Sequence, residues 1–353
     1  MPTEAEKNQA LDEYYEKLEN ARAELQSGFD RNERRVADIK SFTPVSVIGS
    51  GGFGAVLKVF HQGQGPYAVK VQRKSFIRKY KYQQDIILER KLLAYMNSPF
   101  VVSLLSHCKD AVNVYLVVPY ARYGDLSRML KRAGPVPEAR AVKIIIQVVL
   151  ALEYIHACNV IYRDLKPHNI LIFDKGRVKI GDFGCSARCD GEIIGKTGTT
   201  VYRAPEMILG EYYSEAVDWW ALGVVIHEVL LNEYPFCGKK DAKATLYKNV
   251  ILGYYRNLKS PNFSEVAENL VKSLLVKQPS NRLGGSEKPG ASAVKKHEWF
   301  KDIDLYNVIF GEEQFHLDNT ELIAVDEVWV PRDKFMSSRP EAQDPLRADL
   351  EEF

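Results

Sequence analysis

Two aspartates, Asp164 and Asp182, are the residues of this sequence whose types and spacing best suit chemistry. They lie eighteen residues apart, the first in the run YRDLKPHN at 162–169 and the second at the start of DFG at 182–184. Phosphoryl transfer needs two carboxylates in different surroundings, because one must lie beside the attacking hydroxyl and another must bind the Mg²⁺ that neutralises the phosphates. Either aspartate alone would indicate little, since most aspartates are solvated surface residues or helix caps. The pair predicts a base and a metal ligand.

The residues around these aspartates have distinct expected roles. Asp164 would orient the substrate hydroxyl and accept its proton, while Lys166 would stabilise charge on the transferring group. Asn169 would hold a second metal ion, and Asp182 would join metal to phosphates. Charge compensation of this kind is often the largest catalytic term. We therefore expect ATP and Mg²⁺ as cosubstrate and cofactor.

A glycine-rich loop near the start of the chain could hold the phosphates of ATP. The run GSGGFGAV at 49–56 has the pattern G-x-G-x-x-G-x-V. Chance alone would give such a pattern in about one in ten chains of this glycine content, and a hairpin turn could require the same glycines. A dinucleotide-binding loop would open into a helix, whereas residues 55–60 are typical of a strand. The residues expected to contact ATP are Gly49, Ser50, Gly51, Gly52, Phe53, Gly54 and Val56.

A lysine and a glutamate downstream of this loop could form an ion pair. Lys70 ends the apolar run YAVK at 67–70, and Glu89 follows nineteen residues later inside a predicted helix. A strand lysine held by a helix glutamate positions the α- and β-phosphates in phosphoryl-transfer sites. The alternative is a surface salt bridge, which would contribute little to stability. The apolar strand around Lys70 favours the functional interpretation.

The composition excludes several other classes of protein. The 353 residues are enough for two lobes, and a formal net charge of +2 indicates neither nucleic-acid binding nor attachment to a membrane surface. The five cysteines include no C-x-x-C pair, which argues against a zinc cluster and favours a reducing compartment, the cytoplasm or also the nucleus. No apolar run is long enough to span a bilayer, and the start of the chain has no secretory or myristoylation signal.

Hydrophobic periodicity predicts an α+β fold, with a small β-rich part followed by a larger, mainly helical part. An amphipathic helix is expected first, over residues 4–25. Strands are expected at 45–48, 55–60, 67–71, 101–105 and 114–118, with one helix among them at 84–95. Helical faces follow at 141–157, 216–231 and 270–275, and the chain from Glu312 onward is acidic and aperiodic.

Taken in order, these motifs make residues 42–300 resemble eukaryotic protein kinases of the AGC group. The tyrosine at 162, the run AVDWWALG at 216–223 and HEWF at 297–300 are most similar to cyclic-AMP-dependent protein kinases. The resemblance implies a two-lobed kinase fold that transfers phosphate from ATP to Ser or Thr of a protein. The implied divisions are an amino-terminal helix and linker at 1–41, an N-lobe at 42–118, a hinge at 119–124, a C-lobe at 125–300 and an AGC-type tail at 301–353.

The resemblance also assigns residues that motif chemistry alone does not. It places adenine between Ala68 and Leu171, with Val118 behind it and hinge contacts at Pro119 and Ala121. It makes Thr199 the partner of the catalytic aspartate and lysine. It further implies that Glu206 pairs with Arg282 and that Asp218 braces the catalytic loop. An internal spine is implied for Leu93, Leu104, Tyr162 and Phe183. Phe29 would anchor the first helix, and Leu350 to Phe353 would dock on the small lobe. Trp329 is a candidate to reach the adenine, the alternative being a tryptophan packed in the core.

The activation segment, residues 182–206, departs from the family. The threonine that relatives phosphorylate falls on Gly195, and two of its basic partners are replaced by Ala187 and Asp85. Loss of the anion together with most of its cations is coherent, because stranded positive charges would repel one another. We hypothesise that activity does not need phosphorylation. Thr197 is the rival phosphorylation site.

Substrate and partner choice also look altered. The resemblance implies that a substrate peptide is recognised by Asp125, His168, Glu228, Lys196, Thr200 and Arg203. The two acids favour arginines upstream of the acceptor, whereas the last three predict tolerance of polar or acidic residues after it. A tryptophan on which the family's cyclic-AMP regulatory subunit relies falls on Ile194, which argues against that partner while leaving another regulatory protein open. A monomeric catalytic chain is expected.

Two other functions stay open at this point. A pseudokinase acting as a nucleotide-gated scaffold usually lacks the lysine, the base or the metal aspartate, and none of these is missing here. A small-molecule phosphotransferase would not need the peptide-binding segment that begins with GT at 198–199 and ends with APE at 204–206. An active Ser/Thr protein kinase is the leading hypothesis.

Overall fold

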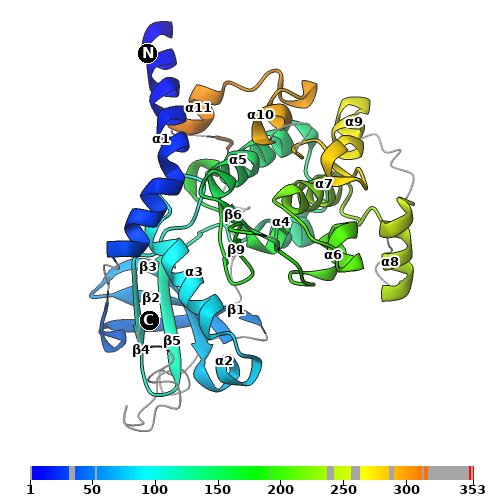
Figure 1. The fold of residues 1–353 in the computed structure, drawn as a ribbon. Helices are drawn as coiled ribbons and strands as arrows, with labels where there is room; N and C mark the ends of the chain where they lie inside the picture. The colour runs from blue at the N-terminus through cyan, green and yellow to red at the C-terminus, as the bar shows by residue number, and fades with distance from the viewer. Residues whose placement is uncertain are drawn as a thin grey trace. The chain divides into compact units, whose positions relative to one another are not determined.

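The computed structural model describes residues 2–31, 36–51, 54–191, 193–236, 242–255, 263–285, 290–311, 314–316, 350 and 353. They divide into two compact units, each drawn in Figure 1. One, the helical unit, falls within 1–23, 98–100 and 123–321. The other, the sheet unit, falls within 24–97, 101–122 and 322–353.

The sheet unit contains a five-stranded antiparallel sheet in the order β1-β2-β3-β5-β4. Alternating side chains bury one face of it, because successive residues of a strand point to opposite sides; Leu57, Val59, Val69 and Val71 belong to this core. Its elements are β1 (Phe42–Gly51), β2 (Gly54–His61), β3 (Gln64–Arg73), α2 (Lys74–Tyr80), α3 (Gln83–Tyr95), β4 (Ser106–Lys109) and β5 (Asn113–Pro119).

One predicted strand of this unit is wrong. Residues 101–105 form no strand, and β4 begins only at Ser106. Val102 and Leu104 are 2% and 1% exposed, and the Leu104 amide donates to the Leu93 carbonyl at 2.7 Å. The run is apolar because it packs beside α3, and a short apolar run cannot by itself distinguish such packing from strand pairing.

The helical unit is built around α5 and α7, both buried over most of their length. Trp219 and Trp220 of α7 are fully buried. The two central helices are α5 (Glu138–Ala157) and α7 (Ala216–Leu231), and the α-helices around them are α4 (Leu126–Ala133), α6 (Pro205–Leu209), α8 (Lys243–Leu252), α9 (Glu265–Leu274), α10 (Gly290–Lys295) and α11 (Leu305–Phe310). Two short antiparallel ribbons complete it, β6 (Val160–Ile161) with β9 (Ala187–Arg188), and β7 (Ile170–Ile172) with β8 (Val178–Ile180).

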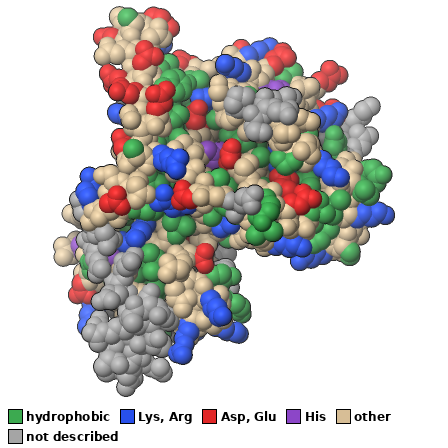
Figure 2. All heavy atoms as spheres, in the orientation of Figure 1, with side chains coloured by type: hydrophobic (Ala, Val, Ile, Leu, Met, Phe, Trp, Pro, Cys, Tyr) green, Lys and Arg blue, Asp and Glu red, His purple; other side chains and the backbone are tan. Residues whose placement is uncertain are grey.

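The amino-terminal helix α1 (Glu4–Arg31) is longer than predicted, but its predicted amphipathic character, with one apolar face buried, is confirmed. Ala21 and Leu25 are 0% and 3% exposed, and Figure 2 shows acidic side chains along the face of α1 turned to the viewer. Its last turns lie in the sheet unit, where the ring of Phe29 lies 6.0 Å from that of Tyr95 on α3. The described helices include none with the length and apolar character needed to cross a membrane.

The end of the chain also packs in the sheet unit. Leu350 and Phe353 are 0% and 3% exposed, and the ring of Phe353 meets that of His107 at 5.4 Å. Lys109 donates a hydrogen bond from Nζ to the Leu350 carbonyl. The predicted docking is confirmed for these two residues, whereas Trp329 lies outside the described residues.

Candidate active site

The antiparallel β7–β8 ribbon brings the two expected metal ligands, Asn169 and Asp182, to the same end of the ribbon. Ile170 pairs with Ile180, and the Gly181 amide donates to the Asn169 carbonyl at 3.0 Å. Asn169 precedes β7 and Asp182 follows β8, so the antiparallel ribbon places them at the same end. Asp182 has a φ of 57° and an exposed side chain. The ribbon therefore offers an amide and a carboxylate close together.

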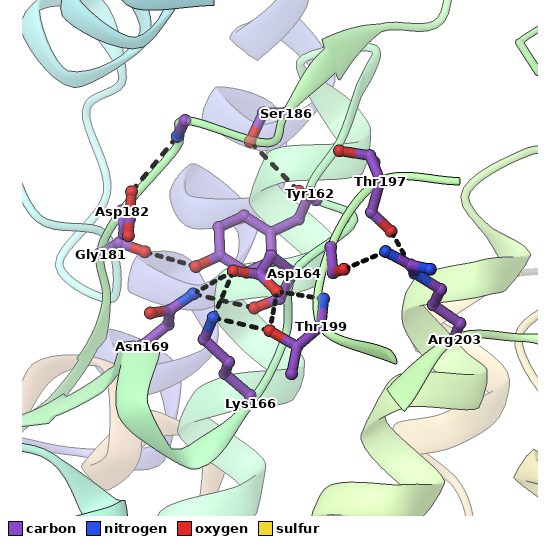
Figure 3. A network of polar contacts seen from close by, with 12 residues as sticks. Tyr162, Asp164, Lys166, Asn169, Gly181, Asp182, Ser186, Thr197, Thr199 and Arg203 are labelled. Atoms are coloured by element: carbon purple, nitrogen blue, oxygen red, sulfur yellow. Dashed lines mark hydrogen bonds and ion pairs between the residues drawn. The ribbon is translucent and has the colours of Figure 1, made fainter. Parts of the chain in front are cut away.

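Asp164 lies at the centre of a closed network of hydrogen bonds (Figure 3). Lys166 Nζ donates to Asp164 Oδ2 at 2.7 Å, while the amide and Oγ1 of Thr199 donate to Oδ1 at 2.9 and 2.8 Å. Asn169 Nδ2 donates to the Asp164 carbonyl at 2.9 Å and to Oδ2 at 3.1 Å. Lys166 Nζ also donates to Thr199 Oγ1 at 2.8 Å. The carboxylate is 7% exposed and fixed in orientation.

The catalytic loop that carries Asp164 is braced from α7. Asp218, which is 0% exposed, accepts hydrogen bonds from the amides of Tyr162 at 2.9 Å and Arg163 at 2.8 Å. His156 Nε2 on α5 completes the arrangement at 2.8 Å from the same carboxylate. The expected brace by Asp218 is present, whereas His156 was missed because a lone histidine near a helix end has no distinctive pattern.

Two side chains of the catalytic loop, Arg163 and Tyr162, contact the chain around the start of the activation segment. Arg163 has a φ of 67°, and its guanidinium donates to the carbonyls of Cys185 at 2.6 Å and Ser186 at 3.2 Å and to Tyr213 Oη at 3.2 Å. Tyr162 donates its hydroxyl to the Gly181 carbonyl, and its ring meets Phe183 at 5.3 Å. These contacts tie the loop to the beginning of the activation segment.

Gly198 is a residue whose importance the sequence motif did not reveal. Its φ is 74°, and a Cβ there would lie 2.2 Å from the Arg163 carbonyl oxygen. Only glycine fits both the backbone conformation and this close approach. The main chain just before Thr199 therefore rests directly on the catalytic loop.

The chemistry of Asn169 and Asp182 fits a magnesium site. Mg²⁺ prefers oxygen ligands and is commonly held by one or two carboxylates together with substrate phosphates. Asn169 uses its Nδ2 toward Asp164, so its Oδ1 is the atom suited to a cation. The residues present are of the type that would hold the metal.

The expected nucleotide residues of the sheet unit gather on neighbouring strands. Lys70 Nζ on β3 lies 2.6 Å from Glu89 Oε1 on α3, and Glu89 is 1% exposed. Lys70 pairs in register with Val56 on β2, and Ala68 pairs with Val118 on β5. Gly49 pairs with Val56 next to them, Pro119 ends β5 and Ala121 follows. Gly52 and Phe53 lie outside the described residues, and Leu171 lies on β7 of the helical unit.

The two acids expected to bind substrate arginines already have partners within the chain. Asp125 caps the start of α4, where its side chain accepts from the Arg128 amide at 3.0 Å and meets Arg128 Nε at 3.2 Å. Glu228 on α7 accepts from Tyr202 Oη at 2.6 Å. Both remain only partly buried.

The other residues expected to bind substrate differ in their contacts within the chain and in their exposure to solvent. His168 lies 3.1 Å from Ser127 Oγ, and desolvation lowers the pKa of its imidazole. Lys196 is exposed, and Thr200 begins a 3-10 turn, Thr200–Tyr202. Arg203 is instead bound to main-chain carbonyls of its own segment.

The end of the activation segment is anchored by a buried ion pair. Both terminal nitrogens of Arg282 donate to Glu206, at 2.8 and 3.1 Å, and the side chains are 0% and 3% exposed. Arg282 Nη1 also donates to the Ala216 carbonyl at 2.7 Å. The expected pairing is confirmed.

Comparisons with known proteins agree with this geometry. Residues 42–300 match the protein kinase domain family. The chain is 35% identical over 267 residues to a Dictyostelium discoideum protein named cAMP-dependent protein kinase catalytic subunit, covering 75% of this chain and 40% of that protein. It is 32% identical over 298 residues to cAMP-dependent protein kinase catalytic subunit 2 of Drosophila melanogaster, covering 84% and 83%. It is 34% identical over 284 residues to the serine/threonine-protein kinase gad8 of Schizosaccharomyces pombe, covering 79% and 49%.

Proposed function

Because this chain belongs to the protein kinase family, as the order of its motifs predicted, we propose that it transfers the γ-phosphoryl group of ATP to serine or threonine side chains of proteins. The observation that carries the proposal is the network that Lys166, Asn169 and Thr199 form around Asp164. The names of its relatives, serine/threonine and cyclic-nucleotide-dependent protein kinases, support the same reaction class.

The groups around Asp164 would prepare the acceptor hydroxyl. Thr199 holds Oδ1 with two hydrogen bonds, so the carboxylate has one orientation toward its surroundings. The hydroxyl proton passes to Asp164 as the hydroxyl oxygen bonds to phosphorus and the bond to ADP breaks. Lys166 Nζ, already beside Asp164 Oδ2, stabilises negative charge on the phosphoryl group in transfer.

Different residues are proposed to contact the metal and the phosphates of the nucleotide. Asn169 and Asp182 are the residues proposed to hold Mg²⁺, which when bound supplies positive charge to the phosphates. Lys70, oriented by Glu89, is proposed to contact the α- and β-phosphates. Residues 42–300 are accordingly proposed as the catalytic domain, with its lobes and hinge divided at 118 and 124.

Protein substrates with basic residues before the acceptor fit this site best. Asp125 and Glu228 are partly buried carboxylates, and arginine forms strong charge-assisted hydrogen bonds with such groups. Lys196 and Thr200 are of a kind that would accept a polar or acidic residue after the acceptor. We further propose that the chain acts as a monomer in the cytoplasm or also in the nucleus. It is proposed to act without a cyclic-AMP regulatory subunit.

Phosphorylation of the activation segment is proposed to be unnecessary. Arg163, the remaining basic residue of the set that binds phosphate in relatives, directs its guanidinium to main-chain carbonyls and Tyr213 Oη. Gly195 has a φ of 139° and no side chain to modify. The segment is thus supported by contacts that require no added anion.

An ATP-hydrolysis and phosphotransfer assay tests this function directly. The purified chain is incubated with ATP and Mg²⁺, with and without a mixed library of arginine-containing Ser/Thr peptides, beside an Asp164→Asn control. Peptide-dependent ADP formation with label on peptide is expected. Nucleotide binding without turnover would support the scaffold alternative, and turnover only with added small alcohols or sugars would support a small-molecule phosphotransferase.

A further inference from the structure

Arg203 makes an unusual set of contacts within its own segment. Its Nε donates to the Thr197 carbonyl at 2.8 Å and its Nη2 to the Gly198 carbonyl at 2.6 Å. Its Nη1 lies 3.4 Å from Tyr247 Oη on α8. The planar fork of a guanidinium suits two adjacent acceptors, whereas the single ammonium of lysine does not reproduce that geometry.

The two carbonyls that Arg203 holds lie immediately before Thr199. Thr199 is the residue whose amide and hydroxyl both donate to Asp164 Oδ1. Gly198 in turn rests on the Arg163 carbonyl, with no room for a Cβ. A displacement of residues 197–198 would therefore move both donors away from the carboxylate. Figure 3 shows this path from Arg203 to Asp164.

A small cavity adjoins Arg203. A cavity of about 10 Å³ lies among Arg163, Thr199, Arg203 and their neighbours from α6 and α7, enough for at most one water molecule. In the part of the chain that the structure describes, Arg203 and Arg163 both direct their donors to main-chain carbonyls and tyrosine hydroxyls. Each of the three nitrogens of Arg203 thus has an acceptor within the chain before any substrate arrives.

We propose that Arg203 is a positioning residue for phosphoryl transfer, which clamps residues 197–198 so that Thr199 holds Asp164, and that it is not a determinant of substrate choice. The inference rests on the proposed kinase activity. It replaces the expectation that Arg203 lines the pocket for the residue after the acceptor. That pocket then depends on Lys196 and Thr200.

The kinetic test separates positioning from substrate binding. We expect Arg203→Lys to lower kcat about 10-fold and Arg203→Met about 30- to 100-fold, because small displacements of catalytic groups have effects of this size. The KM for ATP and for peptide should stay within about 2-fold, and the loss should be equal for peptides that differ after the acceptor. Arg188→Lys, which alters a surface ion pair with Asp190, is the matched control and should leave kcat unchanged.

Chemical rescue and hydrogen exchange add readouts that a general loss of stability would not reproduce. Guanidinium ion should restore part of the kcat of Arg203→Ala, and ammonium ion should not. Amide exchange in a peptide covering residues 196–202 should accelerate in Arg203→Met but not in Arg188→Lys, since the Thr199 amide loses its acceptor. Tyr247→Phe removes the longest of the contacts and should change kcat less than about 2-fold.

The outcomes are distinguishable from failure of the proposed function. The clamp would be overturned if the wild type is active and the Arg203 variants keep its kcat but change the peptide KM according to the residue after the acceptor. An inactive wild type would overturn the kinase proposal, while the exchange experiment would still decide the clamp. If Arg203→Met does not fold, Arg203→Lys with its exchange pattern carries the test.

Discussion

The catalytic loop, residues 162–169, and the activation segment, residues 182–206, are held by groups of opposite charge. The loop is fixed by a buried acid, since Asp218 accepts from two of its amides. The segment is fixed by arginines, since Arg163 and Arg203 donate to its carbonyls near either end. One region has its main-chain donors satisfied and the other has its main-chain acceptors satisfied.

The burial of these anchors differs as much as their charge. Asp218 is 0% exposed and shares its carboxylate with His156, so the brace cannot change without disturbing the core of the helical unit. Arg203 is only partly buried. A fully satisfied buried network favours one arrangement, whereas partly exposed hydrogen bonds exchange more readily with water. The comparison indicates that the anchor of the catalytic loop is the more rigid of the two, and that the anchor of the activation segment at Arg203 is the more exposed to water.

The largest expected effect comes from the first residue of the activation segment. Asp182→Ala should lower turnover by at least about 10³-fold, because it removes a proposed metal ligand. The side chain is exposed, so the melting temperature should change little. Asp190→Ala, which removes an exposed carboxylate of the same segment, should leave turnover within about 2-fold. Equal losses in both variants would mean that the position of the charge is unimportant.

The contact between the two regions should respond strongly to a single methyl group. Gly198→Ala is expected to lower kcat roughly 10- to 100-fold and to destabilise the fold by about 1–3 kcal/mol, because the added Cβ collides with the Arg163 carbonyl at a left-handed φ. Gly191→Ala adds the same atom to open space in the same segment. Urea unfolding and steady-state kinetics of both variants measure the difference, which should vanish if the segment is free to move away from the loop.

A smaller effect is expected from pH at the substrate end of the loop. His168 has a pKa lowered by desolvation, with Asp125, Asp164, Lys131 and Lys166 as its charged neighbours. Its imidazole is therefore neutral at neutral pH and gains positive charge as pH falls through a value below its usual 6.5. That charge should raise the KM for arginine-containing peptides about 2- to 3-fold between about pH 7.5 and 5.5.

His168→Gln should lose this pH dependence and keep the wild-type kcat at neutral pH. Peptide KM is measured for both chains with an arginine-containing and an arginine-free peptide. A rise of equal size in the variant would assign the pH effect to another group.

The smallest effect is expected at Thr197. Arg203 uses the Thr197 carbonyl, which alanine retains, so Thr197→Ala should keep activity within about 2-fold of wild type. Activity as low as that of Asp182→Ala would show that phosphorylation of Thr197 is required. Mass spectrometry of the active wild type provides an independent measure of its modification.

Motif chemistry predicted the residues whose roles depend on type and order along the chain. Lys70 and Glu89 form their ion pair, because a reaction restricts which residue can stand at such positions. The contacts of Asp164 with Lys166 and Thr199 were implied by the family resemblance. Helix α7 has the predicted bounds because its apolar pattern continues through the whole element.

Residues that act through tertiary contacts could not be predicted in the same way. An arginine can bind a carboxylate, a phosphate or a carbonyl, and only the folded chain decides that Arg203 meets carbonyls. His156 acts through Asp218, which lies 62 positions away, and residues 101–105 are apolar without being a strand. In each of these places the local pattern is compatible with more than one environment.

The brace from Asp218 affects the order in which the protein becomes competent during its synthesis. Its carboxylate lies 56 and 55 positions after the amides it holds, so a nascent chain that has emerged only through DFG carries its catalytic loop without an acceptor for them. Domains generally fold as units during translation, and here the catalytic loop gains its acceptor only after α7 has been synthesised. If the chain were divided between the catalytic loop and α7, neither fragment alone would be active. Inducing the two fragments to associate would then restore activity, which would make the enzyme inducible.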